Sequence, residues 1–250
     1  MTAEPIISPD ASSLAASVAA RTITVLSDRL ANAPVAHLCL TGGTIGTASL
    51  QAIAASPAVR SVDWGRVHVW WSDERFETTG DPLRNETEAR SEFLDLVPVL
   101  ATNVHPMPAP GHSWGSDVDA AAASYTEAVL REGGGRVPAW DVLMLGVGPD
   151  GHVASLFPGL PGITQEGTVI GVVDSPKPPP VRMSFTLSTI NAAREVCLVA
   201  SGSSKADAIA RALNQGADSG LPAALVRGTH RTLALLDVDA AAGLSLKTLN

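Results

Sequence analysis

The stretch at residues 140–159, WDVLMLGVGPDGHVASLFPG, decides the fold. Residues 141–145 form a short apolar run, which is typical of a strand buried on both faces. The run leads directly into a glycine-rich turn that carries Asp150 and His152. In an open parallel sheet, ligands bind in the crevice beyond the carboxyl ends of the strands, where this turn would lie. An acid and an imidazole in that position are poorly placed for core packing and indicate a functional site.

The glycines of this turn also match the dinucleotide-binding pattern G-x-G-x-x-G, at positions 146, 148 and 151. In that motif a long helix begins at once after the last glycine, and its N-terminus holds the pyrophosphate. Here Pro158 and Gly159 would end any helix after little more than one turn, and Pro149 lies between the glycines. The sequence therefore argues against a nicotinamide-dependent enzyme, and we expect no cofactor.

The composition is that of a globular protein. The chain has 250 residues, of which 45% are hydrophobic and 17% charged, and we expect one domain over residues 1–250. No apolar run approaches the roughly 18 residues that span a bilayer, and the first residues do not resemble a signal peptide. Cys39 and Cys197 lie in apolar runs, which favours buried thiols over a disulfide. We expect a cytoplasmic protein without membrane contact.

The net charge indicates which kinds of molecule the protein can bind. Lys and Arg total 17 against 25 Asp and Glu, which gives a net charge of −8. This excludes the electrostatic footprint of a nucleic-acid-binding protein. An anionic small molecule would have to be attracted locally, by the few cations beside glycine-rich turns. The oligomeric state is not indicated by the sequence.

Apolar runs and capping signals predict alternating strands and helices. The expected strands cover residues 35–40, 67–71, 141–145, 168–173, 195–200 and 232–237, with an alternating segment at 182–186 and a short edge strand at 104–107. The expected helices cover residues 9–30, 45–55, 86–96, 116–131, 187–193 and 206–214, the first capped by Ser8. This alternation predicts a single-domain α/β fold of the Rossmann-like kind, with a largely parallel open sheet and helices on both faces.

Four polar turns follow expected strands, at residues 41–44, 72–75, 146–152 and 201–205. Taken singly, the first is also compatible with a plain tight turn and the second with a solvated loop. In a parallel sheet, however, all four would collect along one rim. The first turn, TGGT before a helix, can hold a phosphate with backbone N–H groups and the helix N-terminus.

Other polar residues have simpler interpretations. His68 lies inside an expected strand and is interpreted as a packing residue, while His105 and His112 lie in a proline-rich loop. Nothing near them has zinc-ligand spacing, so we expect no metal site. Residues 175–180, SPKPPP, are interpreted as a stiff surface connection.

Five stretches together resemble the 6-phosphogluconolactonases in order and spacing: LTGGT, WWSDERF, DVLMLGVGPDGHVASLFPG, RMSFTLSTIN and SGSSKADAI. The match spans about residues 38–214, and DGHxASLFPG is its most specific part. These enzymes share their fold with the glucosamine-6-phosphate deaminases, which carry similar motifs. The deaminases usually have an aromatic residue after the Asp-Glu pair and an acidic residue shortly after DGH. This chain has Arg75 and Phe157 there, which favours the lactonase.

The chain departs from the family pattern at two places. The family's glycine loop commonly reads GGS followed soon by proline, whereas this chain has Thr44, Ile45 and Gly46. Thr44 keeps a hydroxyl group and the backbone donors, so phosphate binding should survive. Arg84 replaces a more usual serine, and the sequence does not predict the consequence.

The resemblance implies hydrolysis of 6-phospho-D-glucono-1,5-lactone in the oxidative pentose phosphate pathway, without a metal ion. Hydrolysis needs a base for the attacking water and stabilisation of the oxyanion. His152 is the expected base, since histidine titrates near neutral pH. Asp150 would orient the imidazole or contact sugar hydroxyls, and Asp73 would do the latter. Arg75 would face the oxyanion or the phosphate.

For the phosphate, the resemblance implicates Gly42, Gly43, Thr44, Arg182 and Lys205. Two other functions stay open: a glucosamine-6-phosphate deaminase, and a non-catalytic sugar-phosphate sensor on the same fold. A sensor would have no need of a base.

The central stretch contains one hydroxyl side chain, that of Ser155. Ser155 follows the DGH motif, but no G-x-S-x-G elbow surrounds it. It is therefore interpreted as a helix or pocket residue and not as a nucleophile.

Overall fold

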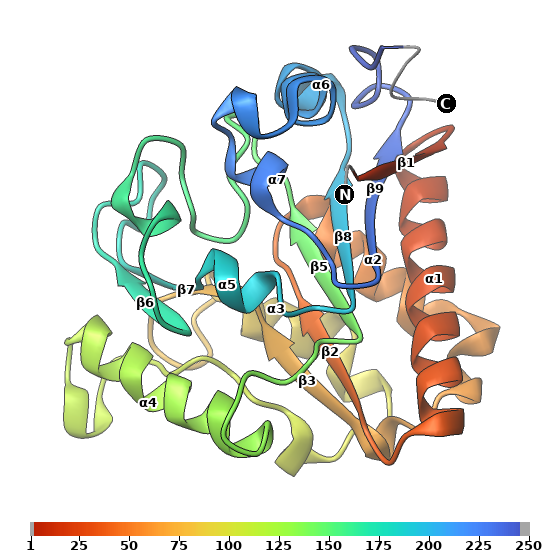
Figure 1. Ribbon diagram of the computed structural model, residues 1–250. Coiled ribbons are helices and arrows are strands. Elements are labelled where there is room, and N and C mark those ends of the chain that lie inside the picture. Colours follow the sequence, from red (N-terminus) through yellow and green to blue (C-terminus); the bar gives the residue numbers. More distant parts are fainter. Residues whose placement is uncertain (1–2, 246–250) are drawn as a thin grey trace.

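The computed structural model describes residues 3–245 and contains two sheets (Figure 1). In the main sheet six parallel strands follow the order β1-β9-β8-β5-β2-β3. Their bounds are β1 Glu4–Ser8, β2 Ala36–Leu40, β3 Val67–Trp71, β5 Val142–Gly146, β8 Glu195–Ala200 and β9 Arg231–Asp237. A smaller antiparallel sheet has the order β4-β7-β6, with β4 Asp73–Arg75, β6 Val169–Val172 and β7 Arg182–Phe185.

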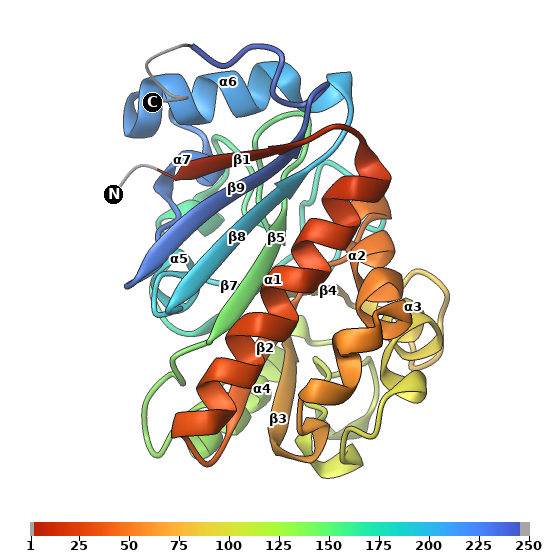
Figure 2. The ribbon, with the colours of Figure 1, turned by 90° about the vertical axis from the view of Figure 1, so that its right-hand side faces the viewer.

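Helices cover both faces of the main sheet. One face carries α1 Ala11–Asn32, α2 Thr44–Ala55 and α3 Asn85–Glu92, and Figure 2 shows α1 lying across the strands. The other face carries the small sheet together with α4 Val118–Glu132, α5 Leu187–Ile190, α6 Ala206–Gln215 and α7 Pro222–Leu225. Strand β5 serves both cores, because Val142 and Met144 pack toward α1 while Leu143 and Leu145 pack toward the opposite layer. The two-sided apolar run in the sequence is thereby explained.

The predicted α/β fold with a largely parallel sheet and helices on both faces is confirmed. The six strands expected in the chain after residue 30 agree with the structure to within one residue at each end. Both cysteines are buried free thiols, as expected. Every helix within residues 3–245 is too short or too polar to span a lipid bilayer. The single-domain prediction also covered residues 1–2 and 246–250, which lie outside the described part.

Several local predictions were wrong. Ser8 does not cap α1: it ends the edge strand β1, which pairs with β9, and the cap is Asp10, whose side chain accepts a hydrogen bond from the backbone N–H of Ser13 at 2.7 Å. Residues 104–107 form no strand, since only an isolated bridge links Val104 to Val69. The helix expected over 86–96 ends at Glu92, and that over 187–193 is one turn long.

The predicted turn at residues 72–75 is in fact mostly a strand. After β3 the chain continues through Ser72 into β4, which pairs with β7 so that Asp73 lies opposite Ser184 and Arg75 opposite Arg182. The small sheet therefore places residues from β4 and β7 beside the carboxyl ends of the main strands. The other three polar turns follow β2, β5 and β8 directly, so they share one rim as expected.

Candidate active site

A cavity of about 540 Å³ lies at this rim. Every predicted site residue except Asp150 lines it. Its polar lining comes from segments that are far apart in the sequence: Thr41, Gly42, Gly43, Thr44, Asp73, Arg75, Asn85, Gly148, His152, Lys177, Arg182, Ser201, Ser204 and Lys205. The chain thus gathers four cationic side chains in one hollow despite its negative net charge.

The glycine loop after β2 is built for close backbone approach. Gly43 adopts φ +83° and forms the N-cap of α2 without any side-chain cap, which leaves the first-turn N–H groups of that helix available to an anion. A Cβ atom on Gly42 would lie 1.9 Å from Oδ1 of Asn85, so only glycine fits there. The Thr41 hydroxyl accepts a hydrogen bond from the N–H of Gly146 at 3.0 Å and ties the loop to the end of β5.

Asn85 fixes the arginine of β4. Its Oδ1 accepts a hydrogen bond from Nη1 of Arg75 at 2.6 Å, and its Nδ2 donates to the carbonyl oxygen of Asp73 at 3.0 Å. The carboxylate of Glu74, which is fully buried, accepts from the backbone N–H groups of Arg75, Asn85 and Glu86 at 2.7–2.8 Å. Glu74 therefore points away from the cavity and holds the start of α3 against β4. Sequence reasoning identified neither Asn85 nor this role of Glu74.

Arg84, the residue that departs from the family pattern, is 1% exposed. It forms an ion pair with Glu86 at 3.0 Å and lies 3.9 Å from Glu74. It also donates hydrogen bonds to the carbonyl oxygens of Met107, at 2.6 Å, and Glu77, at 3.1 Å. Arg84 is thus a buried cation that joins β4, α3 and the loop around residue 107.

Asp150 and His152 form a hydrogen-bonded pair at the cavity wall. Oδ1 of Asp150 lies 2.5 Å from Nδ1 of His152, and Nζ of Lys177 lies 3.5 Å from that oxygen and 3.2 Å from that nitrogen. Nε2 of His152 has no hydrogen-bond partner among residues 3–245. The geometry thus joins an acid, an imidazole and an ammonium group in one contact.

The ionisation of these groups follows from their surroundings. Burial lowers the pKa of His152, Lys177 lowers it further, and the hydrogen bond and charge of Asp150 oppose the shift only in part. Burial alone would raise the pKa of Asp150, but His152 and Lys177 together lower it. At neutral pH the pair is therefore a carboxylate and a neutral imidazole.

Position 148, next to the Asp150–His152 pair, also requires glycine. A Cβ atom on Gly148 would lie 2.0 Å from two ring atoms of His152 and 2.5 Å from Oδ1 of Asp150. Ala154 and Ser155 form a turn between the bridged residues Val153 and Leu156, and Ala154 has φ +49°, so the short helix expected around Ser155 is absent. The Ser155 hydroxyl instead donates a hydrogen bond to Oδ2 of Asp73 at 2.7 Å.

Lys177 was missed because residues 175–180 were interpreted as a surface connection. Arg182 holds this loop, since its Nε donates to the carbonyl oxygen of Pro179 at 3.1 Å and its Nη2 to that of Lys177 at 3.0 Å. The Arg182 guanidinium also lies 5.9 Å from the ring centroid of Phe157. The available signal was a lysine four positions after the expected strand at 168–173 in an anionic chain, shortly before another cation.

The sequence matches a family model described as glucosamine-6-phosphate isomerases/6-phosphogluconolactonase, over residues 9–235. The chain belongs to this family. A 6-phosphogluconolactonase of Streptomyces coelicolor is 49% identical over 248 residues, a match that covers 97% of this chain and 95% of the relative. One of Mycobacterium tuberculosis is 40% identical over 241 residues, covering 95% and 97%. With these relatives, the chain is an enzyme of the lactonase branch.

Solved structures show the same fold. A 6-phosphogluconolactonase from Leishmania guyanensis superposes with a TM-score of 0.83 at 23% identity, covering 98% of this chain and all of that one. A monomeric glucosamine-6-phosphate deaminase gives a TM-score of 0.79 at 18% identity, covering 96% and 99%. Lactonases and deaminases thus share this fold, and the likeness alone does not separate the two activities.

Proposed function

We propose that this enzyme hydrolyses 6-phospho-D-glucono-1,5-lactone to 6-phospho-D-gluconate, as a step of the oxidative pentose phosphate pathway in the cytoplasm. The observation that carries the proposal is the contact between Asp150 and His152, 2.5 Å apart, at the wall of a cavity lined by four cations. A lactone is an activated ester, and a positioned base with local positive charge is what its hydrolysis needs. Names of relatives and the motif resemblance support the substrate assignment.

His152 acts as the base through Nε2. Because ionised Asp150 can only accept, the shared proton resides on Nδ1 of His152 and the lone pair resides on Nε2. Nε2 takes a proton from water as the water oxygen bonds to C1 of the lactone. The bond from C1 to the ring oxygen then breaks, and His152 returns the proton to that oxygen, which becomes the C5 hydroxyl group. No step of this sequence requires a metal ion.

The cations divide between the phosphate of the substrate and its lactone carbonyl, where negative charge develops during the reaction. The first turn of α2, from Gly42 to Thr44, and Lys205 receive the phosphate, since helix N-terminal donors and an ammonium group suit a dianion. Lys177 and Arg75 face the reacting carbonyl. Asp73, held by Ser155, accepts hydrogen bonds from sugar hydroxyls. Arg182 adds positive charge and fixes the loop that carries Lys177.

The test assays the purified chain with both candidate substrates. We expect lactone hydrolysis well above the spontaneous rate and no ammonia release from glucosamine 6-phosphate. His152→Ala should lower kcat by about 10²–10⁴-fold, the usual contribution of general base catalysis. His230→Ala, which removes an exposed histidine outside the cavity, should match the wild type.

Other outcomes identify the alternatives. Ammonia release without lactone turnover would establish a deaminase. Binding of phosphogluconate without turnover of either substrate would establish a sensor. A His152→Ala variant with wild-type kcat would show that His152 is not the base. The proposal that the chain hydrolyses the lactone would still stand.

A further inference from the structure

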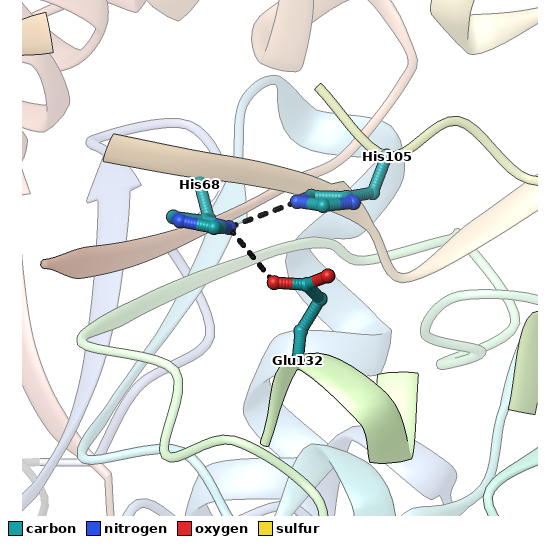
Figure 3. Close-up of side chains that lie close together, drawn as sticks. All are labelled: His68, His105 and Glu132. Carbon is teal, nitrogen blue, oxygen red and sulfur yellow. Dashed lines mark hydrogen bonds and ion pairs between the residues drawn. The ribbon is translucent and has the colours of Figure 1, made fainter. Parts of the chain in front are cut away.

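A second group of ionisable side chains lies apart from the cavity. Figure 3 shows His68, His105 and Glu132 directed toward one another, with Nδ1 of His68 at 2.9 Å from Nε2 of His105 and 3.8 Å from Oε2 of Glu132. All three ligand atoms lie within 4.8 Å of one another. None of these residues lines the catalytic cavity. His68 is the second residue of β3, whereas the cavity lies beyond the carboxyl ends of the strands.

The fold holds this group firmly although its members are far apart in sequence. The backbone N–H of His105 donates to the carbonyl oxygen of Val69 at 2.9 Å, and the Tyr125 hydroxyl donates to the carbonyl oxygen of His105 at 2.7 Å. The ring of Trp70 stacks on that of His105 with centroids 3.9 Å apart. Glu132 is the last residue of α4, where the helix dipole favours a cation. The two imidazoles are therefore preorganised, and the carboxylate reaches them from the surface.

The spacing suits one small metal ion. Two imidazole nitrogens 2.9 Å apart must share either a proton or a cation, because their lone pairs otherwise repel. In a tetrahedral zinc site with Zn–N of about 2.0–2.1 Å, the two nitrogens lie about 3.3 Å apart. The two histidine nitrogens need to separate by about 0.4 Å, and the Glu132 oxygen, at 3.8 Å, needs to approach Nδ1 of His68 by about 0.5 Å. Exposed Glu132 can move in this way at little cost.

A third histidine, His37, lies beside this group, with its ring centroid 5.1 Å from that of His68. The neighbouring His37 has its Nδ1 occupied, since that atom accepts a hydrogen bond from Nε1 of Trp70 at 3.2 Å.

We propose that His68, His105 and Glu132 bind one divalent transition-metal ion, with Zn²⁺ the best match for two imidazoles and a carboxylate. Water completes the tetrahedron on the exposed side. The ion links β3, the loop at residue 105 and the end of α4. It stabilises this edge of the fold and takes no part in lactone hydrolysis.

The experiment uses the full chain after chelator treatment and buffer exchange. Titration with Zn²⁺ by calorimetry should give one ion per chain, and Co²⁺ should produce the intense visible bands of a tetrahedral site. Glu132→Gln and His105→Gln should each weaken Zn²⁺ binding at least tenfold, since even the loss of a residue that only supports a ligand costs 10–100-fold in affinity. Glu132→Gln should keep the wild-type rate of lactone hydrolysis.

Matched controls and a third variant keep the test decisive. Glu127→Gln removes an exposed carboxylate from the same helix and His112→Gln an exposed imidazole from the preceding loop, and neither should alter the affinity. Absence of stoichiometric binding would overturn the site and leave the histidines as a hydrogen-bonded pair. Binding that survives Glu132→Gln and His105→Gln but is lost in His152→Asn would place the ion in the catalytic cavity and equally overturn it.

Discussion

At the scale of single residues, the imidazole of His152 is controlled by two neighbours of opposite charge. Burial is the largest influence and lowers the pKa of His152, Asp150 raises it, and Lys177 lowers it. The base must be neutral to accept a proton, so a lowered pKa extends its working range toward acid. In the proposed mechanism Lys177, 3.2 Å from Nδ1, therefore adds to the effect of burial in extending activity toward lower pH, and it also contributes positive charge at the reacting carbonyl.

Removal of this charge should move the acidic limb of the pH profile. In the wild type, kcat/KM should fall as the pH drops through a pKa below 6.5, where His152 becomes protonated. Lys177→Met keeps the length of the side chain but removes the charge that disfavours the imidazolium. The pKa of His152 then rises, so the limb moves to higher pH. A pH-stat assay corrected for spontaneous hydrolysis measures both profiles.

A second lysine separates this effect from general loss of positive charge. Lys205 also lines the cavity but makes no contact with His152 among the hydrogen bonds and ion pairs of residues 3–245. Lys205→Met should raise KM and leave the midpoint of the limb in place. An unchanged midpoint in Lys177→Met would contradict the electrostatic role, whatever the change in the maximal rate.

At the scale of elements, buried Arg84 joins three pieces of chain that carry the site. Two acids surround it, Glu86 at 3.0 Å and Glu74 at 3.9 Å, and Glu74 holds the start of α3. Burial raises the pKa of Glu74 to about 7, and Arg84 opposes this shift, so loss of the cation makes the buried carboxylates more costly to keep charged. Arg84 thus supports the segments that carry Arg75 and Asn85.

Restoring serine at this position should destabilise the fold strongly. Arg84→Ser leaves buried carboxylates without their cation, which costs about 3–5 kcal/mol. Arg90→Ser breaks the other ion pair of Glu86, at 2.9 Å, but the Arg90 side chain is 42% exposed and the loss should be about 0.3–0.5 kcal/mol. Urea unfolding of both variants compares the free energies directly. Similar small losses in the two variants would show that the buried pair adds no stability.

The sequence predicted the strands and helices better than it predicted the contacts between them. Two-sided apolar runs such as the one before Gly146 identify parallel strands, because burial on both faces leaves a pattern in the strand itself. Edge strand β1 was missed because EPIIS is short and its partner, β9, lies more than 220 residues away. Its last residue, Ser8, also resembles a helix cap, and only the position of Asp10 in space decides between the two.

In the candidate site, likewise, the sequence motif located some residues and missed others that tertiary packing brings in. Asp150 and His152 are neighbours in sequence on one turn, so the motif located them together. Lys177 lies in a proline-rich loop, and Arg182 holds this loop against the turn that carries Asp150 and His152. The contact between Lys177 and His152 therefore depends on tertiary contacts alone. Asn85 likewise reaches Arg75 only after α3 docks on β4. Residue types can suggest such partners, but the distances come from the packing.

At the scale of the whole molecule, the cavity joins segments from residue 11 to residue 205. A ligand that contacts the turns after β2, β5 and β8 together with the small sheet binds only the folded chain. It should therefore stabilise the entire fold and not one element. The phosphate should carry much of this effect, because a protein of net charge −8 has few other places that attract a dianion.

The product 6-phosphogluconate should accordingly raise the melting temperature. At 100 times its Kd, binding to the native state adds about 2.7 kcal/mol. For a chain of this size each kcal/mol corresponds to about 2–4 °C, so the shift should be about 5–10 °C. Gluconate, which lacks the phosphate, should give little protection at the same concentration. Lys205→Ala should reduce the shift produced by 6-phosphogluconate, while Arg227→Ala, which alters an exposed residue outside the cavity, should retain it. Equal protection by gluconate and 6-phosphogluconate would mean that the glycine loop and Lys205 do not bind the phosphate, and the cationic side of the cavity would need another ligand.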